Sequence, residues 1–340
     1  MRRQRGVALI TVLLVVAIVT VISAAMVSRQ QLSIRSTSNQ LQARQAWHYA
    51  LGGEALAQSI LQRDARLGSA ATATGSADPD AQPGGPATPP PSVDHLRERW
   101  AQPQPAFKVE QAEIRLRIDD LAGRFNLNNL VQEMQPNAAA IAQFRRLLLR
   151  LQISEPYAER LVDWLDADQQ TTGETGAEEN AYLLLDPPYR SADQRLFDLS
   201  ELRLLLGMRE EDFQRLAPHV SALPPGTPLN VNTASALVLS TLADDFGLGI
   251  GEALVQARPP TGFANIEAFR AQPALGAVQL QDADLAVGSQ YFQATSEVRL
   301  AERRMALVSL LKREDDGAVR VLQRNLGQPP RLATTSDGER

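Results

Sequence analysis

The chain has 340 residues, enough for about two domains besides any membrane segment. It has no cysteine, which excludes disulfides, thiolate metal sites and cysteine nucleophiles, and its three histidines are too widely separated to predict a histidine-based metal site or catalytic triad. The formal net charge of −5 gives no electrostatic reason to bind nucleic acid.

The N-terminus combines a basic leader with a long apolar run. Three arginines precede Gly6, and residues 7–28 carry no charge. As an α-helix this run is about 33 Å long, enough to cross a hydrocarbon core of about 30 Å. The arginines favour a cytoplasmic N-terminus. Residues 29–66 contain no proline and predict a continuing, more polar helix. Its expected apolar positions are Leu32, Ala43, Trp47, Ala50, Leu56 and Ile60.

This N-terminal pattern resembles a type IV pilin-like precursor. The resemblance implies that a prepilin peptidase cuts between Gly6 and Val7 and that the new Val7 amine is methylated. Two other interpretations remain: a Sec signal peptide cut near Ser23-Ala24-Ala25, and an uncleaved membrane anchor. The apolar run is longer than the 7–15 residues usual in a Sec signal, which favours pilin-type processing.

Residues 68–105 have the composition of a flexible linker. They are rich in Pro, Gly, Ala, Thr and Ser, which cannot bury enough apolar surface to order themselves. A short helical piece at 94–101 is expected to interrupt the linker. Residues 107–118 then alternate apolar and charged positions, which predicts a half-buried strand, followed by a turn at 119–124.

From Pro136 to His219 the apolar spacing becomes helical. Residues 141–151 present one apolar face, and residues 157–165 predict a second helix. Ser200 is expected to cap a helix over 201–206, and residues 233–256 are again expected to be helical.

The last stretch is predicted to be β. Alternate residues from Phe292 to Leu300 are small or apolar, and further strands are expected at 305–312 and 318–326. Between the last two, Asp315-Asp316-Gly317 is a strong hairpin signal. The order of elements favours an α+β fold in which an α-helical domain interrupts an antiparallel sheet.

The helical block narrows the resemblance to the K-type minor pseudopilins of the type II secretion system. The segments that carry it are Asp120–Asn128 (DLAGRFNLN), Asp163–Asp168 (DWLDAD), Gly176–Tyr182 (GAEENAY), Pro188–Arg190 (PYR), Ser200–Arg203 (SELR), Gly207-Met208 and Leu229–Ala234 (LNVNTA). Each is weak alone, but their order behind a pilin-like N-terminus is specific. The implied fold is type IV pilin-like, a long N-terminal helix on an antiparallel sheet, with a large inserted α-helical domain that contains helix-hairpin-helix or SAM-like units.

Position five of the predicted mature chain departs from the common pilin pattern. Most pilins have a glutamate there, which is thought to pair with the N-terminal amine of a subunit already in place, whereas this chain has Thr11. A subunit without this carboxylate could be the first in the filament, which implies a place at the tip. Thr11 could equally be an ordinary helix residue whose hydroxyl bonds to a backbone carbonyl.

An acidic loop is a candidate cation site. Asp166, Asp168, Glu178 and Glu179 fall within 14 residues that include Gly173 and Gly176 but no lysine or arginine. Carboxylates gathered on a short loop are typical Ca²⁺ ligands, although the offsets are not those of an EF-hand. An exposed, solvated acidic loop is the alternative. Resemblance to the K type, which binds calcium, favours a structural calcium site at these four residues.

Residues 229–269 resemble a helix-hairpin-helix module, with Gly249-Ile250-Gly251 as its turn. In DNA-binding versions basic residues hold the phosphates, but residues 229–290 contain six acidic residues and only two arginines. The alternative function, a membrane-anchored or exported helix-hairpin-helix protein that binds DNA, is therefore disfavoured. We expect no enzymatic activity, because the sequence lacks a phosphate loop, a nucleophile elbow and a histidine near a nucleophile.

The resemblance implies a non-enzymatic subunit at the tip of the secretion pseudopilus, which initiates and caps the filament for export of folded proteins. Its expected partners are the I-type and J-type minor pseudopilins, then the H type, with prepilin peptidase acting on the precursor and no nucleic acid. The expected location is the inner membrane, single-pass, with a periplasmic body. The expected regions are the leader 1–6, the membrane segment 7–28, the periplasmic helix 29–67, the linker 68–105, the first body strands 106–125, the inserted helical domain 126–288, the C-terminal strands 289–327 and a disordered tail 328–340.

Overall fold

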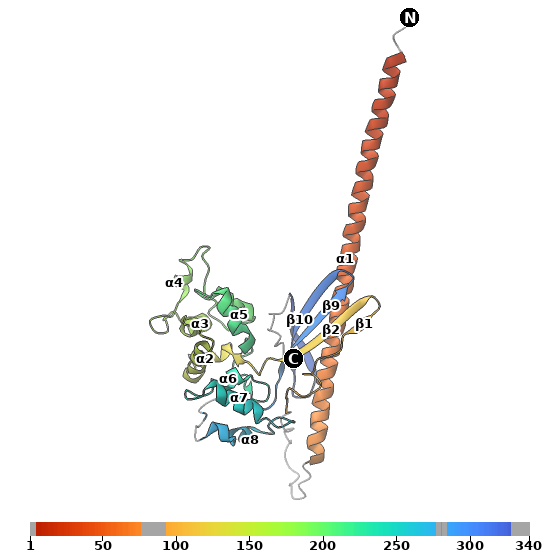
Figure 1. Cartoon of the computed structure of the whole chain (residues 1–340). Coiled ribbons are helices and arrows are strands. Elements are labelled where there is room, and N and C mark those ends of the chain that lie inside the picture. Colours follow the sequence, from red (N-terminus) through yellow and green to blue (C-terminus); the bar gives the residue numbers. More distant parts are fainter. Residues whose placement is uncertain (1–4, 76–92, 277–279, 281–283, 328–340) are drawn as a thin grey trace, which may run out of the picture.

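The computed structural model describes residues 5–75, 93–276, 280 and 284–327. Its dominant element is one straight helix, α1 (Arg5–Gly75), of 71 residues and about 107 Å. The N-terminal half of α1 extends away from the rest of the molecule, and the C-terminal half lies against a sheet (Figure 1). The predicted tail at 328–340 and the middle of the predicted linker, 76–92, lie outside the described residues.

The sheet has five antiparallel strands in the order β1-β2-β9-β10-β11. These strands are β1 (Phe107–Val109), β2 (Ala112–Asp120), β9 (Tyr291–Leu300), β10 (Arg303–Arg313) and β11 (Val319–Leu326). The three predicted C-terminal strands are therefore present. The strand predicted over 107–118 is instead a hairpin, because the chain turns at Glu110, which has a positive φ of 53°, and β2 then continues to Asp120.

Helix α1 packs on the sheet through small residues. Besides Glu54, its buried positions are Ala46, Ala50, Gly53, Ala57 and Leu61, spaced by three or four, and they face the alternate apolar residues of β2, β9 and β10. The predicted apolar face is confirmed at Ala50 and in part at Trp47 and Ile60, which pack at the edges of the two cores, whereas Leu32 and Leu56 are exposed. Small side chains at the centre of the contact allow the helix to approach the sheet closely, so large apolar residues alone do not mark the contact face.

The segment after the linker is part of the body. Residues 96–102 form turns rather than the helix expected over 94–101, and Asp94 and Trp100 are buried. The Trp100 ring meets Phe292 of β9 edge to face, with 5.2 Å between ring centroids. Helix α1 also continues to Gly75. The predicted linker was therefore too long at both ends.

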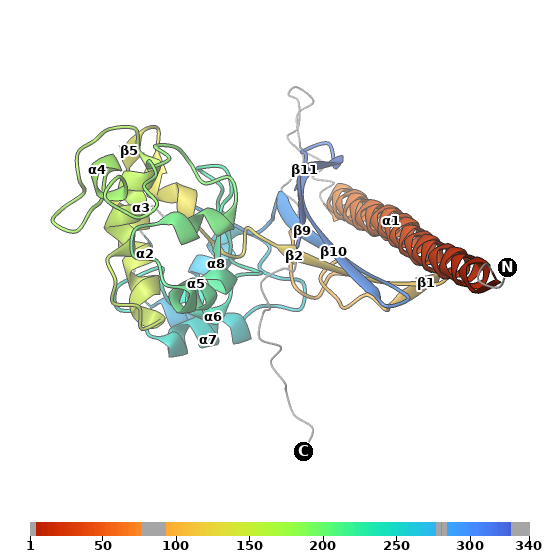
Figure 2. The same ribbon diagram turned by 90° about the horizontal axis from the view of Figure 1, so that it is seen from above.

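The helical domain is inserted between β2 and β9, and it lies on the side of the sheet opposite α1 (Figure 2). Its helices are α2 (Ala138–Arg150), α3 (Tyr157–Leu165), α4 (Glu179–Tyr182), α5 (Glu210–Leu216), α6 (Ala236–Leu239), α7 (Leu248–Gln256) and α8 (Ile266–Arg270). Short 3₁₀ turns are η1 (Leu127–Leu130), η2 (Leu199–Leu204), η3 (Ala217–His219) and η4 (Pro273–Leu275). Three short strand pairs join β3 (Phe125–Asn126) to β6 (Val220–Ser221), β4 (Val131–Gln132) to β5 (Gln135–Pro136), and β7 (Leu229–Asn230) to β8 (Leu285–Ala286).

Three helix predictions need correction. The cap near residue 200 is Asp198, which with Glu201 forms a capping box for η2, rather than Ser200. The helix predicted over 233–256 is two helices, α6 and α7, because the chain turns between residues 240 and 247. The predicted turn at 249–251 lies within the first turn of α7.

The helical domain has two apolar cores, one from Phe125 to Val220 and one from Leu229 to Val287. The asparagines of the sequence motifs connect the segments around them. Asn128 donates to the carbonyls of Leu196 and Leu223 and accepts from the Leu196 amide. Asn232 likewise donates to Phe263 O and Val287 O. These buried side-chain amides supply hydrogen bonds to backbone groups that have no partner in a regular helix or sheet. The asparagines of the sequence motifs therefore have a structural role.

Candidate functional site

The acidic loop starts where α3 ends. Asp166 is the C-cap of α3, with its N–H bonded to Val162 O, and Asp163 lies one turn earlier. On the return side of the loop Glu178 is buried immediately before α4. The Trp164 and Tyr182 rings meet at 5.1 Å between centroids, which holds α4 against α3. Both ends of the loop are therefore fixed by packing.

Three of the four predicted ligands lie together. Carboxylate oxygens of Asp166, Asp168 and Glu178 lie within 4.8 Å of one another. Among the described residues, Oδ1 of Asp166 and both carboxylate oxygens of Glu178 are buried without a hydrogen-bond partner. Buried polar atoms rarely lack a hydrogen-bond partner, so these carboxylates have the arrangement expected of metal ligands.

Two carboxylates that were not predicted complete the cluster. Asp163 has its Oδ1 bonded to the Thr172 amide at 2.8 Å, while its Oδ2 is buried without a partner among the described residues. Asp193 also has one buried oxygen of this kind, and its charge acts on both Asp166 and Glu178. Asp163 could have been found from its spacing, because Asp163 and Asp166 are three residues apart on a helix. Asp193 comes after α4 in the chain, and no local sequence pattern predicts that it returns to this cluster.

Glu179, the fourth predicted ligand, lies outside the cluster. It is partly buried and forms an ion pair with Arg190 at 3.3 Å. The loop also requires a glycine at its return. A Cβ at Gly176 would lie 2.2 Å from Oδ2 of Asp163 and 2.7 Å from the Thr172 amide nitrogen. The backbone therefore approaches these carboxylates too closely for any other residue.

The pKa values describe an electrostatically unfavourable cluster. Burial, followed by the charges of Asp168, Asp163 and Asp193, raises the pKa of Asp166 to about 6. Burial, followed by the surrounding aspartates, raises the pKa of Glu178 to about 7. Only oxygen ligands converge here, which is the donor set that Ca²⁺ prefers. The residues present therefore fit a calcium ion.

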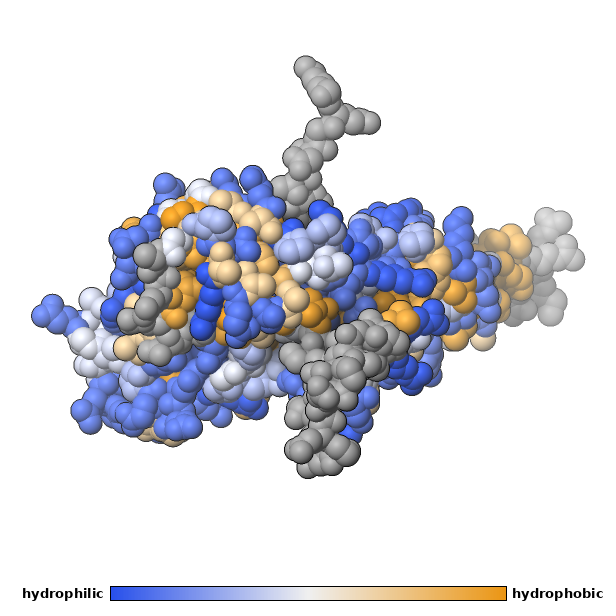
Figure 3. Space-filling view, turned by 90° about the horizontal axis from the view of Figure 1, so that it is seen from below, coloured by the Kyte–Doolittle hydropathy of each residue, from blue (hydrophilic) through white to orange (hydrophobic). Residues whose placement is uncertain are grey.

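The residues predicted for processing lie at the start of α1. Gly6 and Val7 are helical in backbone, and Thr11 is on the exposed part of the helix. Within Leu9–Leu67 an 18-residue window has a mean hydropathy of 2.9 and is not buried, so by length and composition this helix could cross a membrane. Figure 3 shows apolar surface on α1 and also on the underside of the helical domain.

The helix-hairpin-helix region does not present a phosphate site. Near the N-terminus of α7 the charges are Asp244 and Asp245, and Asp244 is paired with Arg146 of α2. Arg258 points inward to the Ala234 carbonyl, and burial lowers its pKa to about 10. A Cβ at Gly251 would lie 2.0 Å from the Ala236 carbonyl oxygen. The glycine thus serves the close packing of α6 on α7.

Comparisons with known proteins agree with this arrangement. Two family models described as type II secretion system (T2SS), protein K match residues 123–225 and 229–288. A type II secretion system protein K from Pseudomonas aeruginosa is 48% identical over 332 residues, covering 96% of this chain and 94% of the relative. One from Klebsiella pneumoniae is 38% identical, covering 92% and 93%. The crystal structure of the GspK-GspI-GspJ complex from enterotoxigenic Escherichia coli matches with a TM-score of 0.71 and 29% identity, over 86% of this chain and 99% of that chain.

Proposed function

The chain belongs to the type II secretion system protein K family of minor pseudopilins, and from this premise we propose that it initiates and caps the tip of the secretion pseudopilus. In this role it is a non-enzymatic structural subunit for the export of folded proteins. It assembles first with the I-type and J-type minor pseudopilins, a proposal supported by its likeness to the structure of the GspK-GspI-GspJ complex, and then with the H type.

The observation that carries this proposal is the division of α1. Its C-terminal half is fixed to the sheet, whereas its apolar N-terminal half is exposed in the structure and long enough to span a membrane. Such a surface needs lipid or other helices as its neighbours. In the proposal the inner membrane holds this half before assembly, with the N-terminus in the cytoplasm, and partner helices cover it in the pseudopilus.

Processing belongs to the same proposal. Prepilin peptidase cuts after Gly6, and the new Val7 amine is methylated. Thr11 supplies no carboxylate for the amine of a subunit ahead of it, which suits a first subunit. The helical domain makes the body much wider than α1 with its sheet (Figure 2), so another subunit could not stack directly over it.

We also propose a structural calcium site in the helical domain. Asp163, Asp166, Asp168, Glu178 and Asp193 would hold the ion. When bound, Ca²⁺ supplies the positive charge that these buried carboxylates lack. The carboxylates then connect the end of α3 to the start of α4, and so fix the long loop between them.

The test of the proposed function is the N-terminus of the mature protein. Intact mass and N-terminal sequencing are compared in cells with and without prepilin peptidase. A chain that starts at methylated Val7 only when the peptidase is present supports the proposal. A start near Met26, or an uncut Met1 in both strains, would remove its basis.

A further inference from the structure

A β-bulge in the last strand reverses the direction of its side chains. In the β10–β11 ladder Leu310 pairs with Gln323 and Leu311 with Val321, so Leu322 is an extra residue. Before the bulge Val321 packs against the core under α1. After it, Arg324 points toward α1, where it bonds to Glu54, and its neighbour Gln323 points to the opposite face.

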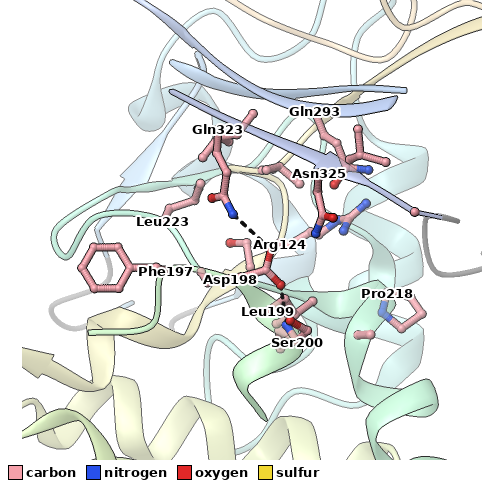
Figure 4. A pocket seen from close by; sticks show the side chains of 18 of the residues that line it. Arg124, Phe197, Asp198, Leu199, Ser200, Pro218, Leu223, Gln293, Gln323 and Asn325 are labelled. Atoms are coloured by element: carbon pink, nitrogen blue, oxygen red, sulfur yellow. Dashed lines mark hydrogen bonds between the residues drawn. The ribbon is translucent and has the colours of Figure 1, made fainter. Parts of the chain in front are cut away.

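That opposite face forms the floor of a groove of about 360 Å³ beneath the helical domain. Gln293, Gln323 and Asn325 extend from the sheet into the groove (Figure 4). Its far wall comes from η2, α5 and the segment after η3, and includes Phe197, which is 52% exposed. The groove is mixed in character, because both the sheet and the far wall contribute apolar and polar side chains.

The charges that line the groove are mostly positive. Arg117, Arg124 and Arg203 line it, and among the described lining residues the only acid is Asp198. The Asp198 carboxylate is already occupied, because it accepts hydrogen bonds from the Ser200 amide and from Gln323.

Arg124 is the cation that remains available. Arg117 is paired with Asp119, and Arg203 with Glu210. For the Arg124 guanidinium, the described residues provide neither an ion pair nor a hydrogen bond, and burial lowers its pKa. The charges of Asp119 and Asp120 act on this guanidinium without forming an ion pair with it, so it can still take a hydrogen-bonded carboxylate from a partner.

The groove opens beside an unpaired strand edge. β11 is the last strand of the sheet order and, within the described chain, pairs as a strand only with β10. Its side chains Leu322 and Leu326 are 50% and 60% exposed. Open edges with exposed apolar residues are the sites where another strand adds to a sheet.

We propose that the groove and the open edge of β11 form a docking site for an extended segment of a partner protein in which apolar and acidic residues alternate. The backbone of that segment pairs with β11. One set of its side chains enters the groove, where a carboxylate meets Arg124. This site does not depend on the proposed place at the filament tip.

The test uses the full chain in detergent micelles and a capped peptide of four Val-Glu repeats, with a Val-Lys peptide as the charge-reversed probe. Calorimetry measures affinity, and hydrogen exchange measures the amides of residues 319–326. We expect the Val-Glu peptide to bind, to slow exchange in β11, and to bind at least tenfold more weakly to Arg124→Gln. The matched control is Arg115→Gln, on β2 outside the groove and 68% exposed, which should change affinity by less than twofold.

A second variant guards against misfolding of Arg124→Gln. Asn325 is exposed on the groove floor, so Asn325→Glu should fold normally and repel the acidic probe, again lowering affinity about tenfold. Equal binding of both peptides, unchanged exchange in β11, or no loss in these two variants would overturn the proposal. Binding of the probe only after removal of residues 328–340 would assign the groove to the chain's own C-terminal segment and also overturn it.

Discussion

Glu54 of α1 accepts two hydrogen bonds, each 2.8 Å long, from the guanidinium of Arg324 in β11. The Glu54 side chain is only 5% exposed, and Ser309 of β10 donates a third hydrogen bond to it. One carboxylate thus joins the long helix to two strands. Burial alone would raise the pKa of Glu54, but the bonds from Arg324 and Ser309 outweigh it and hold the pKa below its ordinary value.

Glu54→Gln should lower the free energy of unfolding by about 2–3 kcal/mol at pH 7, because it leaves a bidentate pair incomplete. Since the folded pKa is lowered, this contribution is present above the unfolded pKa and disappears as pH falls through the folded value. Urea unfolding of the full chain in micelles at pH 7 and pH 3 measures both effects. Glu297→Gln, at an exposed position of β9, is the control, and an equal loss there would contradict this role.

Two adjacent glycines of α1 should respond oppositely to alanine. A Cβ at Gly53 would lie 2.1 Å from Oγ of Ser296, whereas nothing lies within 4 Å of a Cβ at Gly52. Gly52→Ala should stabilise by about 0.5–1 kcal/mol through helix propensity. Gly53→Ala should destabilise by about 1–3 kcal/mol, because the helix must move from the sheet. Thermal unfolding of both variants tests this, and the same sign in both would refute the assigned contact face.

Calcium should stabilise the parent protein and lose its effect in cluster variants. At a calcium concentration 100 times Kd the gain is about 2.7 kcal/mol, or several degrees in Tm. Asp166→Asn and Glu178→Gln should abolish this gain, while Glu174→Gln, in the exposed part of the same loop, should retain it. In chelator, Glu178→Gln should be at least as stable as the parent, because it removes a repelling charge. A parent Tm that is insensitive to calcium would reject the site.

Because of Glu98, the free energy of unfolding should fall as pH rises. It accepts hydrogen bonds from Trp100 Nε1 and the His95 amide, and burial, followed by the charge of Asp64, raises its pKa to about 7. A raised folded pKa contributes stability below about pH 4.5 that is lost as pH rises through about 7. Asp64, with a pKa of about 6, acts in the same direction.

The measurement is the free energy of unfolding in urea between pH 5 and pH 8. The parent should become less stable across this range, and Glu98→Gln should flatten the change. Glu113→Gln, on β2 in an exposed ion pair with Arg115, should leave the slope as in the parent. Identical slopes for Glu98→Gln and the parent would show that Glu98 does not titrate in this window.

If the absence of a carboxylate at position 11 favours the tip, the Thr11→Glu subunit should occupy the tip less often. A glutamate there could pair with the N-terminal amine of a subunit ahead, so the variant should also enter the filament below the tip. Site-specific cross-linking in assembled pseudopili would then show neighbours on both sides, with secretion reduced. Thr11→Val is the matched control, and unchanged position and secretion in Thr11→Glu would separate Thr11 from the tip role.

The sequence predicted regular elements well where the periodicity is strong. The faces of α2 and α3 are observed because both helices bury one side in the same core, and the alternate residues from Phe292 to Leu300 are buried under α1. It was only partly right where large apolar residues were taken to mark the contact face of α1, since Trp47 and Ile60 lie at its edges. Leu56 is exposed, while Ala46 and Gly53 meet the sheet, because close helix–sheet approach selects small side chains.

The candidate cation site could be predicted only in its local part. Asp166 and Asp168 lie on one short segment, and Glu178 returns on the same loop. Asp193 arrives from beyond α4, and its position depends on how residues 183–193 fold over α3. Glu179 was misleading because adjacent residues in a turn point in different directions, and its side chain instead meets Arg190.

The helical domain leaves the sheet after Asp120 and returns at Tyr291, and these two ends meet, since Asp120 pairs with Phe292 and the Leu121 amide bonds to Tyr291 O. The central strand pair β2–β9 is therefore separated by about 170 residues of sequence. Closing so long a loop from an unfolded chain is slow, whereas a folded insert already holds its two ends together. We therefore expect the inserted domain to fold first and to bring β2 to β9.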